Sequence, residues 1–453
     1  MSEAAWQDYV QRIEELASRS GLSFDPVEFE AVPDSFMMEI AVYGLPVRMP
    51  HWSFGLRYIY QLIQRHMGHS RLFEVVFPGN PGHAYLASGN GLAENVLVTA
   101  HVLGHADFSR NNLLFQRCQR QVSEHIVEHA ANHARQIQQA IETHGLERVE
   151  TVLDAALALE QHIDIDQELR RPRYPQYIEA VKTVADDRFR KRFAALEPAA
   201  AAAGAETRKR APVPPHPERD LLWFVAQYAP EMDSWERDIF LAVREESFYF
   251  YPVFATQIMN EGWASYWHAR LLREAAFIPQ QAYLDAVKCH SDVVRPVAAD
   301  SQVALNLNPY HLGFAMWEKI VEEEGMDGAL AIRAQDDDFG FIRNHLTREL
   351  AEELELFRYR ARDGQIRVLE PDLNALHEAI LAPKYNFGAP TVVAQHLRAD
   401  GTLELAHDHS LDGRGLDLER SRRVLDYLQQ VWRRPVLLTT VNQAGLVLEL
   451  SAP

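Results

Sequence analysis

The sequence predicts a mainly α-helical protein with a small α/β domain at its C-terminal end. Apolar residues recur with the 3.6-residue period of a helix over most of residues 1–385. From about residue 386, short segments alternate apolar and polar residues instead. A chain of 453 residues, 47% of them hydrophobic, can build one large domain and one smaller one. We therefore expect a helical domain at residues 1–385 and an α/β domain at residues 386–453.

Amphipathic stretches indicate the helices of the first domain. Residues 1–21, MSEAAWQDYVQRIEELASRSG, read as an acidic amphipathic helix and not as a signal peptide. The apolar run NVLVTA leads into HVLGHADF, which we place on a buried helix. Further helical patterns cover residues 113–143, 150–164, 235–276 and 344–360. Residues 194–218 are rich in alanine, then basic, then rich in proline, which predicts an exposed excursion from the helical domain.

The second domain is predicted to have the order ββαββ. TVVAQHLRADGTLELAHDH alternates apolar and polar residues around Asp400 and Gly401, which is typical of a β-hairpin. GLDLERSRRVLDYLQQVW follows as an amphipathic helix. PVLLTTV and LVLEL then predict two more strands.

Composition excludes several classes of function. The formal net charge of −19 argues against a general affinity for nucleic acid or anionic lipid. The two cysteines, Cys118 and Cys289, cannot form a disulfide framework and fit a reducing compartment. No apolar stretch approaches the length of a membrane span. We expect a soluble, cytoplasmic protein.

Two short motifs predict a metal site. In HVLGHADF, His101 and His105 lie one helical turn apart and present two imidazoles to the same point. In NEGWASYWH, Glu261 and His268 lie seven residues apart on one face of another helix. Two imidazoles and a carboxylate suit a transition-metal ion. We predict a divalent metal at His101, His105 and Glu261, with zinc first and manganese or iron as alternatives.

The spacing of the two histidines is the ligand half of the HExxH zinc-protease motif, whose glutamate is the general base. Val102 stands at that glutamate's position. Glu261, followed by Gly262 and Ala264, resembles the segment that supplies the third ligand in helical gluzincin-type metallopeptidases, which implies a scaffold of that type. The structural alternative is a pair of hydrogen-bonded core histidines, with Glu261 capping a helix or paired to an arginine such as Arg244.

Other residues are candidates to support this chemistry. His268 is a candidate general acid or fourth ligand, or a polar edge of its helix. Glu245 and Glu246 are candidates for the missing general base, although charged helix faces often contain such pairs. The candidates for orienting a ligand imidazole or contacting substrate are Asp107, Asn260, His51, Tyr310 and His311. Capping of a helix by Asp107, and simple packing turns at His51, Tyr310 and His311, are the alternatives.

A rival set of metal ligands lies on the following helices. The histidines recur every four residues in SEHIVEHAANH, and carboxylates accompany them. The set consists of His125, His129 and His133 with Glu124, Glu128, Glu150, Asp154, His162 and Asp164. Ferritin-like bundles build two-metal sites from such side chains. The Glu-x-x-His pairing of those bundles is not clearly repeated, and a solvated helix face is the alternative.

The order of motifs along the chain resembles the stage V sporulation protein R (SpoVR) family. The motifs are MPHWSFG, AHVLGHADFSRNN, VETVLDAALALEQHID, PERDLLWF, IMNEGWASYWH and NPYHLG. The resemblance covers most of the chain, including the small C-terminal domain. It implies a link to spore cortex formation or, in non-sporulating bacteria, to a stress or starvation response. There it also implies functional association with a PrkA-type serine protein kinase and a von Willebrand-A-like protein. No settled biochemical activity follows from the family.

The motifs themselves lead to three functional hypotheses. The first is a metal-dependent hydrolase, an amidase or peptidase acting on a peptide-like or envelope-derived substrate. The second is a catalytically inactive, metallopeptidase-like scaffold or regulatory protein, for which a structural metal would suffice. The third is a di-metal redox protein.

Overall fold

The chain divides into two compact units, each built from two separate stretches of sequence. The computed structural model describes all residues except 1–2, 46–47, 67–73, 123–124, 172–173, 175–211, 296–306, 357–358, 363–364, 369–371, 411–414, 443–444 and 453. The first unit comprises residues 1–161 and 233–389, and the second comprises residues 162–232 and 390–453. The described chain is mainly helical with a small C-terminal β-sheet, which confirms the predicted fold class at that level.

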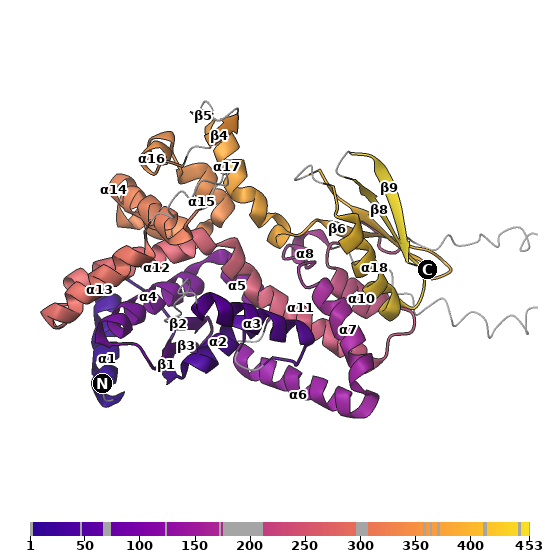
Figure 1. Ribbon diagram of the computed structural model, residues 1–453, viewed down its shortest axis with the longest axis horizontal. Coiled ribbons are helices and arrows are strands. Elements are labelled where there is room, and N and C mark those ends of the chain that lie inside the picture. Colours follow the sequence, from indigo (N-terminus) through magenta and orange to yellow (C-terminus); the bar gives the residue numbers. More distant parts are fainter. Residues whose placement is uncertain are drawn as a thin grey trace, which may run out of the picture. The chain divides into compact units, whose positions relative to one another are not determined.

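The first unit contains most of the helices (Figure 1). Its N-terminal stretch forms α1 (Glu3–Arg19), α2 (Asp34–Tyr43), α3 (Trp52–His66), α4 (Leu92–Asn111), α5 (Leu113–Gln119), α6 (Ile126–His144) and α7 (Leu146–Ala158). Its second stretch forms α11 (Ser234–Ala255), α12 (Gln257–Glu274), α13 (Gln280–Val293), α14 (Pro309–Gln335), α15 (Asp338–His345), α16 (Arg348–Glu353), α17 (Leu373–Leu381) and the 3₁₀ segment η4 (Ala382–Gly388). The pattern predicted over residues 235–276 is therefore two helices, which meet at Thr256.

A three-stranded sheet is the part of the first unit that helical periodicity does not predict. Its strands are β1 (Val27–Val32), β2 (Glu74–Phe77) and β3 (Gly82–Ala87), in the order β1-β3-β2. Strand β3 is parallel to β1 and antiparallel to β2. A separate antiparallel pair consists of β4 (Tyr359–Arg362) and β5 (Gln365–Val368).

The register of the sheet determines which face of β2 meets the helices. Glu74 pairs with Leu86, and Val76 pairs with Ala84. Since alternate residues share one face of a strand, these four side chains point the same way. Ala84 and Leu86 belong to the core that also contains apolar residues of α4 and α12. Glu74 therefore lies on the face of the sheet that packs against this helical core.

The second unit combines the C-terminal sheet with a segment from the middle of the chain. Its elements are α8 (Gln167–Arg170), α10 (Leu221–Tyr228), β6 (Val392–Leu397), β7 (Leu403–His407), α18 (Leu418–Trp432), β8 (Val436–Val441) and β9 (Val447–Ala452). The strands lie in the order β6-β7-β8-β9, with β6 and β7 as the predicted hairpin and with β7 parallel to β8. The C-terminal elements thus follow one another as ββαββ.

Residues 162–232, which the sequence analysis assigned to the helical domain, group with this sheet. Glu218 forms an isolated antiparallel bridge with Ala394 of β6. The ring of Phe224 stacks on Trp432 with a centroid separation of 6.2 Å. The apolar helix α10 thereby adds to the core of a sheet against which α18 also packs. Of the predicted excursion, residues 194–211 lie outside the described part of the chain, and residues 212–218 belong to the second unit.

Among the described helices, none combines the length and the apolar character that crossing a lipid bilayer requires.

Candidate metal centre

The two histidines of α4 and the glutamate of α12 converge on one point. Nε2 of His101 lies 3.0 Å from Nε2 of His105. Oε2 of Glu261 lies 3.5 Å from Nε2 of His101 and 3.4 Å from Nε2 of His105. Two ligands at 2.0–2.1 Å from a tetrahedral zinc ion are about 3.3 Å apart. The three atoms therefore form a triangle of the size that one face of such a coordination sphere requires.

The hydrogen bonding of these atoms fits a cation between them. Nδ1 of His105 donates to Oδ1 of Asn260 at 2.8 Å, which leaves a lone pair on Nε2 of the neutral ring. Oε2 of Glu261 is buried, and no described residue donates a hydrogen bond to it. A buried carboxylate oxygen without a donor is costly unless it binds a proton or a metal. The arrangement of these donor atoms is thus suited to a divalent metal ion.

Further histidines continue from the cluster through successive contacts. Nδ1 of His101 lies 3.0 Å from Nδ1 of His268, and Nε2 of His268 lies 2.6 Å from Nδ1 of His290 on α13. His268 is buried and His290 is half-buried. The contact between Nδ1 of His268 and Nδ1 of His101 orients the ring of His101, as a partner of a metal ligand typically does. His290 was not among the predicted site residues, since a lone histidine in a helical pattern carries no signal.

Charge and burial set the protonation of the cluster. Burial alone would raise the pKa of Glu261, but His105 and His101 hold it well below its usual range. Burial would lower the pKa of His105, but the carboxylate of Glu261 outweighs it and raises that pKa. For His268, burial and the neighbouring histidines both lower the pKa, so its ring is neutral. The cluster therefore combines an ionised carboxylate with the neutral imidazole of His268, and the carboxylate of Glu261 favours positive charge beside it at His105.

Two residues from other elements border the cluster. Burial raises the pKa of Glu74 on β2, while His101 lowers it and Glu261 raises it further, which places Glu74 within electrostatic reach of the cluster. The charge of Glu261 and burial raise the pKa of Tyr310 well above its ordinary value. The ring of Tyr310 stacks on His101 with a centroid separation of 6.1 Å. Tyr310 was a sequence candidate and Glu74 was not; an acidic residue on the inward face of the apolar strand EVVF was the available signal.

A close crossing of α4 and α12 brings the ligands together. Gly104 stands between the two histidines, and a Cβ there would lie 2.7 Å from Cα of Ala264. A Cβ on Gly262 would lie 2.3 Å from the carbonyl carbon of Gly313 on α14. Glycine is thus required at both crossings, which lets the helix backbones approach closely enough for His101 and Glu261 to meet.

The start of α12 is fixed by a buried ion pair. The carboxylate of Asp338 accepts hydrogen bonds from the backbone amides of Ile258 and Met259, at 3.0 and 2.9 Å. Nζ of Lys384 lies 2.8 Å from the same carboxylate. Asp338 therefore caps the helix from α15 and determines where Glu261 begins its turn.

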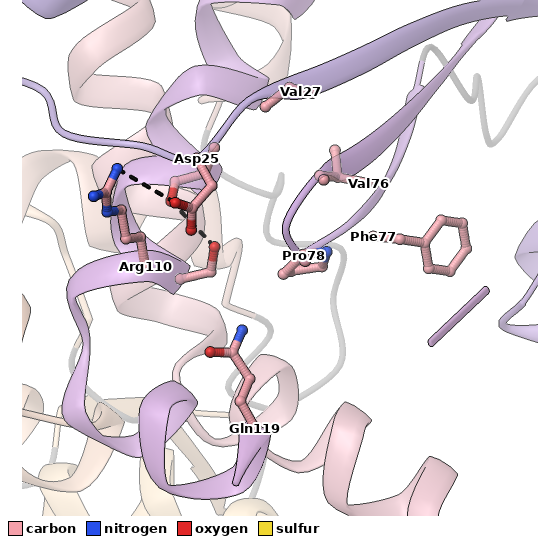
Figure 2. Close-up of a pocket in the computed structure, with 11 residues that line it drawn as sticks. Asp25, Val27, Val76, Phe77, Pro78, Arg110 and Gln119 are labelled. Atoms are coloured by element: carbon pink, nitrogen blue, oxygen red, sulfur yellow. Dashed lines mark hydrogen bonds and ion pairs between the residues drawn. The ribbon is translucent and has the colours of Figure 1, made fainter. Parts of the chain in front are cut away.

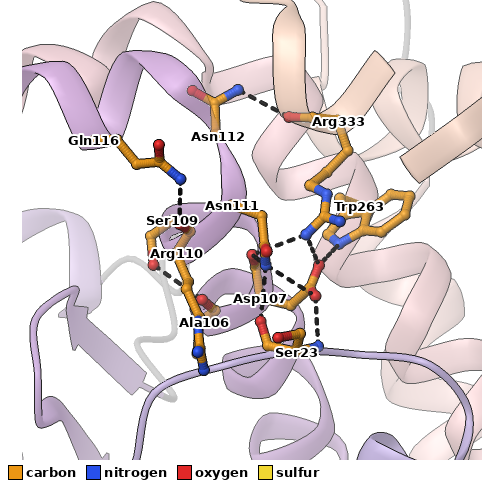
Figure 3. Close-up of polar contacts among 10 residues, drawn as sticks. All are labelled: Ser23, Ala106, Asp107, Ser109, Arg110, Asn111, Asn112, Gln116, Trp263 and Arg333. Carbon is orange, nitrogen blue, oxygen red and sulfur yellow. Dashed lines mark hydrogen bonds and ion pairs between the residues drawn. The ribbon is translucent and has the colours of Figure 1, made fainter. Parts of the chain in front are cut away.

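Asp107 lies near the C-terminal end of α4, and its partners are not the ligand imidazoles that the sequence predicted. Figure 3 shows its carboxylate between three groups, accepting from the amide of Ser23, from Nε1 of Trp263 and from Nη1 of Arg333 at 2.8–2.9 Å. The imidazoles of His105 and His101 are instead contacted by Asn260 and His268, which take the orienting role predicted for Asp107. Asp107 instead joins α4 to α12, α14 and the loop after α1.

The remaining candidates have partners of their own. Nε of Arg48 lies 2.8 Å from Glu246, and Glu245 faces His129 and His133. His51 contacts Ser53 and Asp154 through its two ring nitrogens. His311 is half-buried in the first turn of α14, directly after Tyr310.

The rival constellation does not assemble as one set. Asp154 accepts hydrogen bonds from His51 and Trp52, and His162 and Asp164 belong to the second unit. Glu124 lies outside the described residues. The members that come together are His129 and His133, with Glu245 as their carboxylate.

A pocket lies one turn beyond His105 along α4 (Figure 2). Ala106, Ser109 and Arg110 line it from the helix, and Val76 and Phe77 line it from β2. The guanidinium of Arg110 lies 3.4 Å from Asp25 and donates to the carbonyl of Phe24 at 2.7 Å. The two elements that carry His105 and Glu74 therefore also form the walls of this pocket.

Comparison with known proteins identifies relatives over nearly the whole chain. A family model described as SpoVR like protein matches residues 2–380. The uncharacterized protein YcgB of Escherichia coli (strain K12) is 28% identical over 486 residues, which cover 97% of this chain and 92% of that protein. No solved structure matches the chain.

Proposed function

The chain belongs to the SpoVR-like protein family, and we propose that it is a metal-dependent hydrolase of amide bonds on a gluzincin-like scaffold. His101, His105 and Glu261 would hold the ion. The observation that carries the proposal is the convergence of these three acceptor atoms, with no described donor to Oε2 of Glu261. Their side chains are also reachable from solvent, since His105 is 12% and Glu261 22% exposed.

Three protein ligands leave a coordination position open for chemistry. A bound zinc, manganese or iron ion would supply a water of lowered pKa and polarise the scissile carbonyl. Glu74 accepts the proton of the attacking water and passes it to the leaving nitrogen, the work that the glutamate of HExxH performs elsewhere. The high pKa of Tyr310 keeps its hydroxyl protonated, so that it donates a hydrogen bond to the carbonyl oxygen as negative charge develops there.

The alternative is a scaffold that holds a metal without hydrolysis. Val102 favours it, because the usual general base is absent from α4. In that case Glu74 would be a fourth ligand and would close the coordination sphere, as in structural zinc sites.

Metal content is the first test. We expect about one zinc, manganese or iron ion per chain to remain bound through dialysis against metal-free buffer, by elemental analysis of protein purified without a histidine tag. His101→Ala and Glu261→Ala should each lose it, while Glu30→Gln, an exposed carboxyl of β1 in the same sheet as Glu74, should keep it. A wild-type protein that is metal-free and cannot be reloaded would refute the metal site and the hydrolase with it.

Glu74→Gln separates the two functions. For a hydrolase, the variant keeps its metal and loses at least a hundredfold in kcat on a panel of fluorogenic peptides and muropeptides. Since burial raises the pKa of Glu74 and the base must be ionised, wild-type activity should fall as pH drops through a value above the ordinary range for glutamate. Loss of the metal from Glu74→Gln would instead identify a fourth ligand and favour the scaffold.

The physiological setting that we propose is spore cortex formation or a bacterial stress response, with an envelope-derived peptide as substrate. The kinase and von Willebrand-A-like associates belong to the same proposal. Family membership supports this setting. Recovery of these two proteins with the chain from starved cells would test the association.

A further inference from the structure

A second cluster of two histidines and a glutamate lies apart from the centre described above. Helix α6 carries His129 and His133 one turn apart, and α11 carries Glu245. Nδ1 of His129 lies 3.4 Å from Oε1 of Glu245, and Nε2 of His133 lies 3.5 Å from Oε2 of the same carboxylate. One donor atom from each side chain lies within 4.8 Å of the other two. The cluster shares no residue with the first centre.

The separations fit metal ligands better than hydrogen bonds. A charge-assisted hydrogen bond between nitrogen and a carboxylate oxygen is about 2.7–2.9 Å long. Ligands of one zinc ion are about 3.3 Å apart, close to both distances in this cluster. Nδ1 of His133 is buried, and no described residue hydrogen-bonds to it. No hydrogen bond from that nitrogen therefore fixes the orientation of the ring, whose other nitrogen faces Glu245.

The protonation and surroundings of the cluster also suit a cation. Burial lowers the pKa of His133, against the opposing effect of Glu245. The guanidinium of Arg48 lies 2.8 Å from the adjacent carboxylate, Glu246, and so pairs with Glu246 instead of Glu245.

The three side chains of the cluster are accessible to solvent. The side chain of His133 is 15% exposed, that of Glu245 is 21% and that of His129 is 44%. Water can therefore complete the coordination sphere, and an ion can exchange with solvent. Imidazole ligands select zinc, nickel or copper over magnesium and calcium, which prefer oxygen ligands.

We propose that His129, His133 and Glu245 form a second, surface-accessible site for a borderline divalent cation such as Zn²⁺. The ion ties α6 to α11 and binds independently of the centre at His101. Because the two sites use different residues, each can be removed without the other.

Zinc stoichiometry tests the proposal. We expect equilibrium dialysis at saturating Zn²⁺ to give two ions per wild-type chain. Glu245→Gln and His133→Ala should each bind one, His101→Ala should bind one, and the double variant His101→Ala/His133→Ala should bind none. Zn²⁺ should still raise the Tm of His101→Ala and should lose this effect in the double variant.

Glu128→Gln is the matched control. Like Glu245→Gln it removes one negative charge, but from an exposed residue of α6 that is not a proposed ligand, and it should bind two ions. Glutamine is nearly isosteric with glutamate, so Glu245→Gln remains informative if His133→Ala fails to fold. An unchanged stoichiometry in Glu245→Gln would overturn the second site and leave the first untouched. A single ion, lost from His101→Ala and retained by Glu245→Gln, would do the same.

Discussion

Val102 occupies the position at which HExxH proteases carry their general base, and its side chain is fully buried. It belongs to the core formed by α4, α12 and α14. A glutamate there would be transferred into apolar surroundings, at a cost of several kcal/mol unless it stayed protonated or found a partner. The proposed base, Glu74, instead comes from a strand whose register directs it to the same core. The absence of the motif glutamate is therefore compatible with hydrolysis.

Restoring the motif should damage the protein. We expect Val102→Glu to lower the free energy of unfolding by about 3 kcal/mol or more, because it buries a carboxyl without a partner. Urea unfolding followed by circular dichroism measures the change. Val102→Thr, which nearly keeps the shape and replaces one methyl group by a hydroxyl, should cost only about 1–3 kcal/mol. A Val102→Glu variant as stable as the wild type would contradict this account of the site.

Among the elements, α4 and α12 carry nearly all of the first centre, and their crossing decides its geometry. The ligands of each helix lie within one turn of the contact between Gly104 and Ala264. Figure 1 shows α12 beside α4 within the first unit. The buried pairs of Asp338 with Lys384 and of Asp107 with Arg333 hold the two helices from other elements. Small changes at the crossing should therefore alter the geometry of the proposed metal site.

We expect Gly104→Ala to lower stability by about 1–3 kcal/mol, because its Cβ would meet the backbone of α12. Metal affinity should fall on the order of tenfold as the histidines move away from Glu261. Gly55→Ala is the control: no atom lies within 4 Å of its new Cβ, and alanine should stabilise α3 by about 0.5–1 kcal/mol. Metal titration and thermal unfolding of both variants check this, and equal affinities would contradict it.

At the scale of the whole molecule, each compact unit combines two stretches that are separate in the sequence. The second unit uses residues 162–232 from the middle of the chain and residues 390–453 from its C-terminal part. The chain therefore leaves the first unit after α7 and returns to it at α11. The link between the two stretches includes the bridge of Glu218 with Ala394 and the stacking of Phe224 on Trp432.

Removal of residues 390–453 should therefore expose a helix far away in the sequence. We expect the amides of α10 to exchange with solvent deuterium at least tenfold faster in the truncated chain, since β6 and Trp432 of α18, which contact it, are gone. Amides of α4 and α12 should keep their protection. Hydrogen exchange with mass spectrometry measures both, and an α10 that stays protected would show that it folds without the sheet.

Local patterns alone predicted much of this architecture. The 3.6-residue period predicted most helices, and alternation around Asp400 and Gly401 predicted the C-terminal hairpin. Thr256 was missed as a break because the apolar period continues through it, and the strands of the first sheet were missed because they are short. Partners far away in the sequence stabilise both features, since Asp338 caps the start of α12 and β1 pairs with β3.

The sequence by itself determined which residue types were present for chemistry: His101 and His105 one turn apart, and Glu261 on a second helix. The contact between them was decided only by the tertiary structure, because it depends on the glycine crossings of α12 with α4 and α14. The same is true of Glu74 and of the pairing of Glu245 with His129 and His133. A helix or strand fixes which side chains share its own face, whereas packing between elements fixes which faces meet.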